Sequence, residues 1–221
     1  MDWLIDFFKM DTVMVTILGY PLSYIEAVTT VLTLACIILA ARANILTFAL
    51  GVISTSLSFI LFYQAALYSS MALQVIFFSF NVYGYYKWTR PKTGEENDKN
   101  QLKVSRYSNK STLLLFAAII AAGTLLWGLF VSHPPAFLAN EFADAKYPYV
   151  DAFILVASVV AQFMIAKKKI ENWIIWIVVD IVSTVLYAAS GVTFMAILYG
   201  ILIVNAVYGL TEWIKMYQNN K

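Results

Sequence analysis

The sequence contains little of what catalytic and metal sites are made from. Its 221 residues include one histidine, one cysteine and 13% charged residues, against about 25% charged residues in an ordinary soluble domain. The histidine, His133, stands before two prolines in a predicted loop, so neither a zinc site nor a Ser-His relay is available. A single cysteine, Cys36, excludes an internal disulfide. We therefore expect no enzyme activity and no cofactor.

Other absences narrow the function further. No glycine-rich loop followed by Lys-Ser or Lys-Thr occurs, so direct ATP hydrolysis by this chain is unsupported. The first twenty residues carry three aspartates and one lysine, and they lack the basic start and cleavage site of a secretory signal peptide. The net charge of +2 gives no basis for nucleic-acid binding.

Hydrophobic residues, by contrast, are abundant enough to predict a membrane protein. They make up 61% of the chain, and a helix needs about 20 apolar residues to span a bilayer. Residues 1–20 place aromatic side chains among aspartates and predict a short amphipathic helix at the membrane interface. The fold class is therefore all-α, a polytopic protein with seven transmembrane helices. These are predicted over 22–41, 45–63, 70–88, 112–131, 149–166, 172–190 and 194–214.

The distribution of positive residues predicts the orientation, because Lys and Arg accumulate in cytoplasmic loops. Alternation through seven spans leaves only Lys9 and Lys146 on one side of the membrane, which is then the outside. The N-terminus is therefore predicted outside and the C-terminus in the cytoplasm. The cytoplasmic side receives Arg42, Lys87, Arg90, Lys92, Lys99, Lys103, Arg106, Lys110, Lys167, Lys168, Lys169, Lys215 and Lys221.

The two halves of the sequence resemble each other across a polar segment. Tyr24-Ile-Glu-Ala27 matches Tyr149-Val-Asp-Ala152, and Tyr83-Gly84 matches Tyr208-Gly209, each 125 residues apart. Three helices on each side of one connecting helix predict a parallel 3+1+3 repeat, as in transporters of the SWEET type. The predicted parts are a first repeat over 21–88, a cytoplasmic linker over 89–111, a connecting helix over 112–131, an external loop over 132–148 and a second repeat over 149–214. Glu26 and Asp151, in the first turns of equivalent helices, are predicted to interact with the positive helix ends.

Segment 172–190 carries the most informative polar residues. They follow one another at intervals of 3, 4, 4 and 3 residues, which confines them to one face of a helix. Two indoles and a carboxylate on one face could bind a flat cationic ring, by cation–π contact and by charge. The alternative is that the tryptophans belong to the aromatic belt at the membrane interface. These residues are Trp173, Trp176, Asp180, Thr184 and Tyr187.

Amide side chains occupy two other predicted helices. Gln74 and Asn81 share one face of segment 70–88, and Asn205 lies on the last helix with Tyr208 and Glu212. An amide both donates and accepts hydrogen bonds, which suits a carboxamide or sugar hydroxyls. Buried amides also bond neighbouring helices, so a purely structural role stays open.

Three stretches carry a family resemblance. They are Leu-Ser-Tyr-Ile-Glu-Ala at 22–27, Leu-Gln-Val-Ile-Phe-Phe-Ser-Phe-Asn-Val-Tyr-Gly at 73–84 and Glu-Asn-Trp-Ile-Ile-Trp at 171–176. With them the sequence resembles the PnuC family of vitamin transporters from residue 20 to residue 215. Within that family the Trp-x-x-Trp pair is associated with carriers of nicotinamide riboside. The family motifs include Trp173, Trp176, Gln74 and Asn81.

The resemblance also implies a transport mechanism, a membrane and an oligomeric state. It implies facilitated diffusion (uniport) of nicotinamide riboside through the bacterial inner membrane by a homotrimer surrounded by membrane lipids. A separate cytosolic kinase would phosphorylate the substrate and feed NAD synthesis. Two alternatives stay open, namely a transporter of another vitamin such as thiamine or riboflavin, and a seven-helix receptor or sensor. A receptor would leave the internal repeat unexplained.

Overall fold

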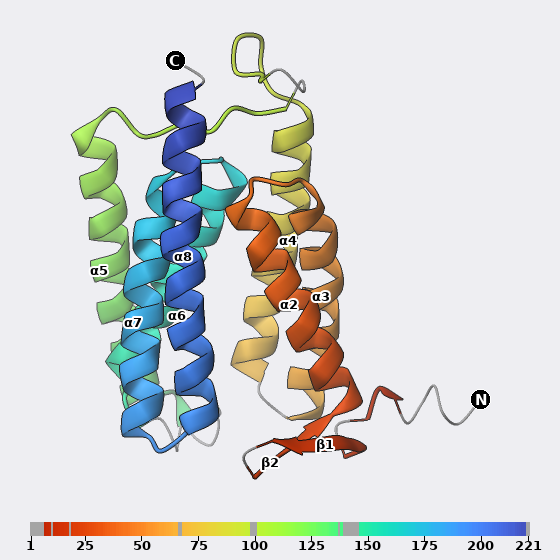
Figure 1. Cartoon of the computed structure of the whole chain (residues 1–221). Helices are drawn as coiled ribbons and strands as arrows, with labels where there is room; N and C mark the ends of the chain where they lie inside the picture. Colours follow the sequence, from red (N-terminus) through yellow and green to blue (C-terminus); the bar gives the residue numbers. More distant parts are fainter. Residues whose placement is uncertain are drawn as a thin grey trace. The chain divides into compact units, whose positions relative to one another are not determined.

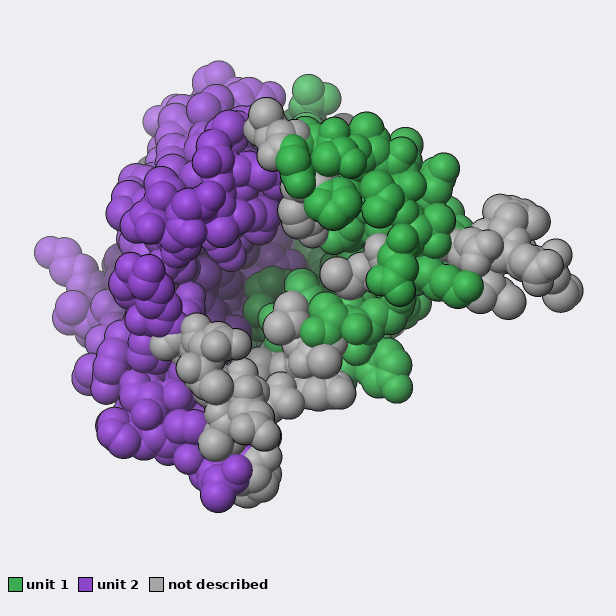
Figure 2. Space-filling model, turned by 90° about the horizontal axis from the view of Figure 1, so that it is seen from below, with its two compact units in different colours: residues 1–87 green, residues 88–221 purple. Residues whose placement is uncertain are grey.

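The computed structural model describes residues 7–9, 11–17, 19–65, 68–97, 101–136, 138 and 146–219. Seven α-helices have their bounds within these residues, which confirms the prediction of a mainly helical chain. The chain divides into two compact units, residues 1–87 and residues 88–221, which Figure 2 shows in different colours.

The first unit contains a β hairpin followed by three helices (Figure 1). Strands β1 (Val13–Ile17) and β2 (Tyr20–Ser23) pair antiparallel. The turn between them contains Gly19, whose φ of 83° favours glycine. The helices are α2 (Tyr24–Ala41), α3 (Leu46–Gln64) and α4 (Tyr68–Thr89), whose last two residues belong to the second unit.

The hairpin differs from the amphipathic helix predicted over residues 1–20. Residues 1–6, 10 and 18 lie outside the described residues, but Val13–Ile17 are extended and paired with β2. Four of the five residues of β1 are β-branched, and such side chains favour strands over helices. This local preference outweighs the amphipathic pattern of the residues before it.

The start of α2 is fixed by a reciprocal cap. The Ser23 backbone N–H donates to the Glu26 carboxylate at 2.8 Å, and the Glu26 backbone N–H donates to Ser23 Oγ at 3.3 Å. Such a capping box satisfies two backbone donors that the helix cannot satisfy itself. The predicted role of Glu26 at the helix end is confirmed.

The second unit is a bundle of four helices that pack in sequence order, each on the next. They are α5 (Lys110–Ser132), α6 (Pro148–Ala166), α7 (Glu171–Ala189) and α8 (Thr193–Asn219). Asp151 lies in the first turn of α6, as predicted. Close packing of α5 on α6 depends on Gly123, because a Cβ there would lie 2.8 Å from the Val156 side chain.

Each predicted membrane span coincides with one of these helices. The ends agree within two residues, except that α8 continues to Asn219. Six helices, α2, α3, α5, α6, α7 and α8, are long and apolar enough to cross a membrane within the described part of the chain. Helix α4 is long enough, but its Tyr, Ser, Asn and Gln residues make it less apolar, so its membrane crossing stays a prediction.

The turn between α2 and α3 has the same backbone structure as the turn between α6 and α7. Ala43 and Lys168 lie 125 residues apart, and both have left-handed φ values, 50° and 54°. In each turn this residue donates its N–H to the carbonyl three residues back. The following residue donates to the carbonyl five residues back, and all four bonds measure 2.8 to 3.0 Å.

Part of the predicted linker is bound to the second unit. Leu102 N donates to Trp88 O at 3.0 Å, and Ser105 N donates to Lys168 O at the same distance. Tyr107 N donates to the Glu171 carboxylate at 2.8 Å. Residues 105–107 therefore lie along the α6–α7 turn, and this part of the linker is fixed to the helices of the second unit.

Candidate functional site

The residues predicted to line one helix face all lie within α7. Because α7 is helical throughout, their spacing puts them on one face. Two of them are buried, Trp173 at 2% exposure and Asp180 at 4%. Trp176, Thr184 and Tyr187 are partly exposed.

Trp173 is packed inside the second unit. Its indole makes an edge contact with Trp213, with ring centres 5.5 Å apart. A Cβ added to Gly209 would lie 2.7 Å from the Trp173 ring, so this approach requires glycine. The buried Nε1–H of Trp173 has no hydrogen-bond partner among the described residues. Of the two tryptophans, Trp176 is the one with exposed surface.

Trp213 continues the aromatic packing toward the end of the unit. Its ring centre lies 6.0 Å from that of Trp88, and both side chains are fully buried. Trp88 Nε1 donates to Ile165 O at 3.3 Å. Aromatic pairs of this kind stabilise a fold by about 0.5 to 1.5 kcal/mol beyond their buried area, so the row from Trp88 to Trp173 fixes the start of α7.

Asp180 is a buried acidic residue in the middle of α7. Thr184 Oγ1 donates to the main-chain oxygen of Asp180 at 2.7 Å, a bond that leaves the carboxylate unused. In the part of the chain that the structure describes, no hydrogen bond or ion pair to that carboxylate is found. A buried carboxylate without a partner is costly. The position therefore suits a cation supplied by a ligand.

Tyr187 is joined at the site by a residue that the sequence pattern does not indicate. It stacks on Tyr199 of α8, with ring centres 5.3 Å apart and an interplanar angle of 14°. Tyr199 is also within electrostatic range of Asp180. Tyr199 lies six residues before Asn205 in α8, off the face that Asn205 shares with Tyr208 and Glu212, so the spacing gives no signal for it.

The predicted amide residues are divided between the two units. In the first unit, Asn81 of α4 is buried at 4% exposure and lies against Gly51 of α3. Gln74, on the same helix, is partly exposed. In the second unit, Asn205 of α8 is partly exposed. The α7 residues and Asn205 thus belong to one unit, and Gln74 and Asn81 to the other.

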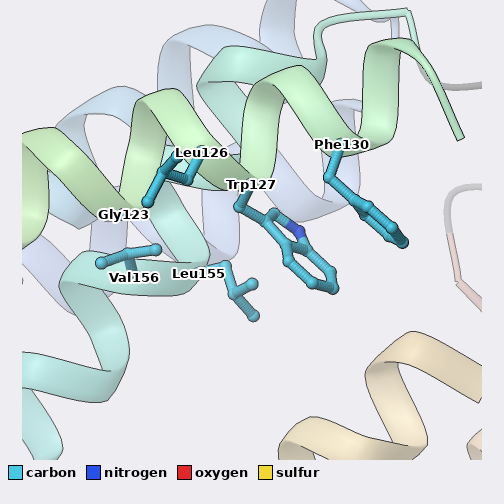
Figure 3. Close-up of a pocket in the computed structure, with 6 residues that line it drawn as sticks. All are labelled: Gly123, Leu126, Trp127, Phe130, Leu155 and Val156. Carbon is cyan, nitrogen blue, oxygen red and sulfur yellow. The ribbon is translucent and has the colours of Figure 1, made fainter.

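An apolar groove on the second unit is separate from these residues. It has a volume of about 430 Å³ and lies between α5 and α6 (Figure 3), lined by Gly123, Leu126, Trp127, Phe130, Leu155 and Val156. Apart from one indole N–H it offers no polar side chain, so it does not suit a ribose or a carboxamide. Among the described residues, no group of three or more His, Cys, Asp or Glu could hold a metal ion.

A family model described as nicotinamide mononucleotide transporter matches residues 23–215. The chain belongs to this family, the PnuC family. The nicotinamide riboside transporter PnuC of Escherichia coli (strain K12) is 33% identical, and the match covers 95% of this chain and 94% of that protein. The PnuC resemblance seen in the sequence is confirmed, and relatives of this kind are named as transporters. The PnuC-family chain is thus a multi-pass membrane protein.

Two further matches extend the comparison. The riboflavin/roseoflavin transporter RibM of Streptomyces davaonensis is 25% identical, over 85% of this chain and 83% of RibM. A solved structure, the crystal structure of the vitamin B3 transporter PnuC, matches with a TM-score of 0.68 at 22% identity, over 90% of this chain and 83% of that one. At this identity the structural match shows the fold.

Proposed function

We propose that this PnuC-family chain carries nicotinamide riboside across the bacterial inner membrane by facilitated diffusion. The observation that carries the proposal is the 33% identity, over 95% of the chain, to the E. coli nicotinamide riboside transporter. The protein is a homotrimer in the lipid bilayer, with its N-terminus outside and its C-terminus in the cytoplasm. A separate cytosolic kinase phosphorylates the imported riboside, which then enters NAD synthesis.

In the proposed site the α7 residues bind the cationic pyridinium ring. The exposed part of the Trp176 indole makes a cation–π contact, and the Asp180 carboxylate balances the positive charge. Trp173, buried against Trp213 and Gly209, holds the start of α7 in position behind the Trp176 ring. The other polar groups of the substrate are the ribose hydroxyls, assigned to Thr184 and Tyr187, and the carboxamide, assigned to Gln74, Asn81 and Asn205.

We also infer that α2–α4 and α6–α8 are two copies of a parallel three-helix repeat joined by α5, the 3+1+3 arrangement of SWEET-type transporters. The matching turns at Ala43 and Lys168 support it. So do two glycine contacts. Phe48 lies against Gly84 in the first unit, and Trp173 lies against Gly209 in the second, with both members shifted by 125 residues.

Uptake by proteoliposomes tests the transport proposal. Liposomes that contain the purified protein should accumulate labelled nicotinamide riboside without ATP. An inside-negative membrane potential should increase the accumulation, because one positive charge gains about 2.3 kcal/mol per 100 mV. Binding without flux would favour a receptor. Uptake that does not respond to the potential would mean that the charge is compensated during transport.

The match to RibM makes riboflavin the alternative substrate to test. The same liposomes should therefore be tested with labelled riboflavin and labelled thiamine. We expect neither to enter faster than through protein-free liposomes, since the proposed site is built for a cation that carries a carboxamide. Entry of riboflavin in place of nicotinamide riboside would move the assignment to a flavin carrier.

A further inference from the structure

We infer that Gly51 is a positioning residue, which holds the Asn81 amide in place for substrate; this inference rests on the role proposed above for Asn81. Gly51 is buried in α3, and Asn81 in α4 is 4% exposed. A Cβ added to Gly51 would lie 2.6 Å from Asn81 Cγ and 2.8 Å from Asn81 Nδ2. Cβ atoms do not approach other heavy atoms so closely, so the amide occupies the space that a side chain at Gly51 would fill.

The contact with Gly51 is what places the amide. Among the described residues no hydrogen bond to the Asn81 side chain is found, so its donor and acceptor groups remain for a ligand. Its side chain is short and has few alternative rotamers within a packed helix pair. Any side chain at Gly51 must therefore turn the amide away from its present position.

The contact between Gly51 and Asn81 can be compared with the equivalent position of the second unit. Gly51 lies 125 residues before Trp176, the spacing that also relates Phe48 to Trp173 and Gly84 to Gly209. In the second unit Trp176 carries an indole. Gly51, the equivalent residue of the first unit, has no side chain, and the Asn81 amide of α4 fills the space beside it. The two units thus offer different chemistry at equivalent positions, an aromatic ring in one and an amide in the other.

The first unit also supplies a matched control. A Cβ added to Gly84 would lie 2.6 Å from Cζ of Phe48, so Gly84 too is crowded by a neighbouring side chain. That neighbour is apolar and has no proposed contact with substrate. Gly84→Ala should therefore disturb packing as Gly51→Ala does, without moving a polar group.

A double-mutant cycle tests the inference. Binding of nicotinamide riboside is measured by calorimetry on detergent-solubilised wild type, Gly51→Ala, Asn81→Ala, the double variant and Gly84→Ala. We expect Gly51→Ala and Asn81→Ala each to weaken binding by about tenfold or more. The double variant should bind no more weakly than Asn81→Ala, because both changes remove the same contact. Gly84→Ala should stay within about twofold of wild type.

Several outcomes would overturn the inference. Wild-type affinity in Gly51→Ala or in Asn81→Ala would do so, and so would losses that add up in the double variant. If Gly51→Ala does not fold, the double variant decides, since it removes the collision. Recovery of a monodisperse protein with the affinity of Asn81→Ala supports positioning, whereas a misfolded double variant means that the glycine serves helix packing alone. Absence of binding by wild type would instead refute the proposed substrate.

Discussion

The Lys168 ammonium lies over the Trp88 indole, with Nζ 4.0 Å from the ring centre. Lys168 is 2% exposed, and burial lowers its pKa to about 8. The cation–π contact offsets part of the cost of removing this charge from water. Because Trp88 contacts Trp213 and Trp213 contacts Trp173, the lysine stands at one end of a row of aromatic residues that leads to α7.

Stability should increase as the pH rises from about 8 toward 10. The pKa of Lys168 is about 8 in the folded protein against an ordinary 10.5. Between these values the unfolded chain binds more protons than the folded chain, so the free energy of unfolding rises by up to about 1.4 kcal/mol per pH unit for this group. Burial lowers the pKa of Lys169 too, which acts in the same direction. Thermal unfolding followed by tryptophan fluorescence measures the change, and an unaltered pH profile in Lys168→Met would contradict the assignment to Lys168.

Replacing Trp176 should weaken substrate binding in proportion to the aromatic surface removed. Trp176→Ala should cost about 1 to 2 kcal/mol in binding of nicotinamide riboside, and Trp176→Phe should cost less because a ring face remains. Calorimetry measures both. Trp127→Ala, at the apolar groove of α5, is the control and should bind like wild type. If Trp176→Ala also binds like wild type, Trp176 is an interfacial belt residue.

Asp180→Asn separates charge from shape. The variant keeps the size and hydrogen bonding of the side chain but removes the negative charge. Binding of the cationic riboside should fall by about tenfold or more, while binding of its neutral reduced form should change little. Asp151→Asn, in the exposed first turn of α6, provides the comparison. Equal losses for both ligands would make Asp180 a packing residue.

The left-handed turn at Ala43 predicts a stabilising substitution. A non-glycine residue at a φ of 50° is strained by about 1 to 2 kcal/mol, so Ala43→Gly should raise the melting temperature. Ala49→Gly, on the exposed face of α3, should lower it, since glycine inside a helix costs about 0.5 to 1 kcal/mol relative to alanine. A lower melting temperature in Ala43→Gly would show that the turn is not strained.

Accessibility of engineered cysteines tests the orientation. In a Cys36→Ala background, Thr93→Cys should react only with membrane-permeant thiol reagents, because its loop is predicted in the cytoplasm. Ala136→Cys should react with impermeant reagents in intact cells. Both positions are exposed, so burial does not limit either reaction. Reversed labelling would place the N-terminus in the cytoplasm.

The sequence predicts the helices well because each one leaves a direct signal. Seven apolar runs define the helices to within a few residues at almost every end, and the intervals on α7 define a shared face. It cannot show that Trp173 is buried against Gly209 or that Asn81 packs against Gly51, because each contact joins two different helices and the spacing of residues within one helix does not indicate it. The sequence also predicts a helix where β1 forms, because apolar residues in a short segment fit both the helical period of about 3.6 residues and the strand period of about two residues.

The hydrogen bonds of residues 102–107 determine how the loop that precedes them responds to an insertion. Residue 88 and residues 102–107 are both hydrogen-bonded within the second unit, so the loop between them begins and ends on the same folded body. Gly94, in the turn from Lys92 to Glu95 of that loop, is exposed and has a φ of 88°. A nick or an insertion there would leave both ends of the loop attached. Gly94 is therefore a good position for fusing a rigid marker protein that adds mass for electron cryomicroscopy.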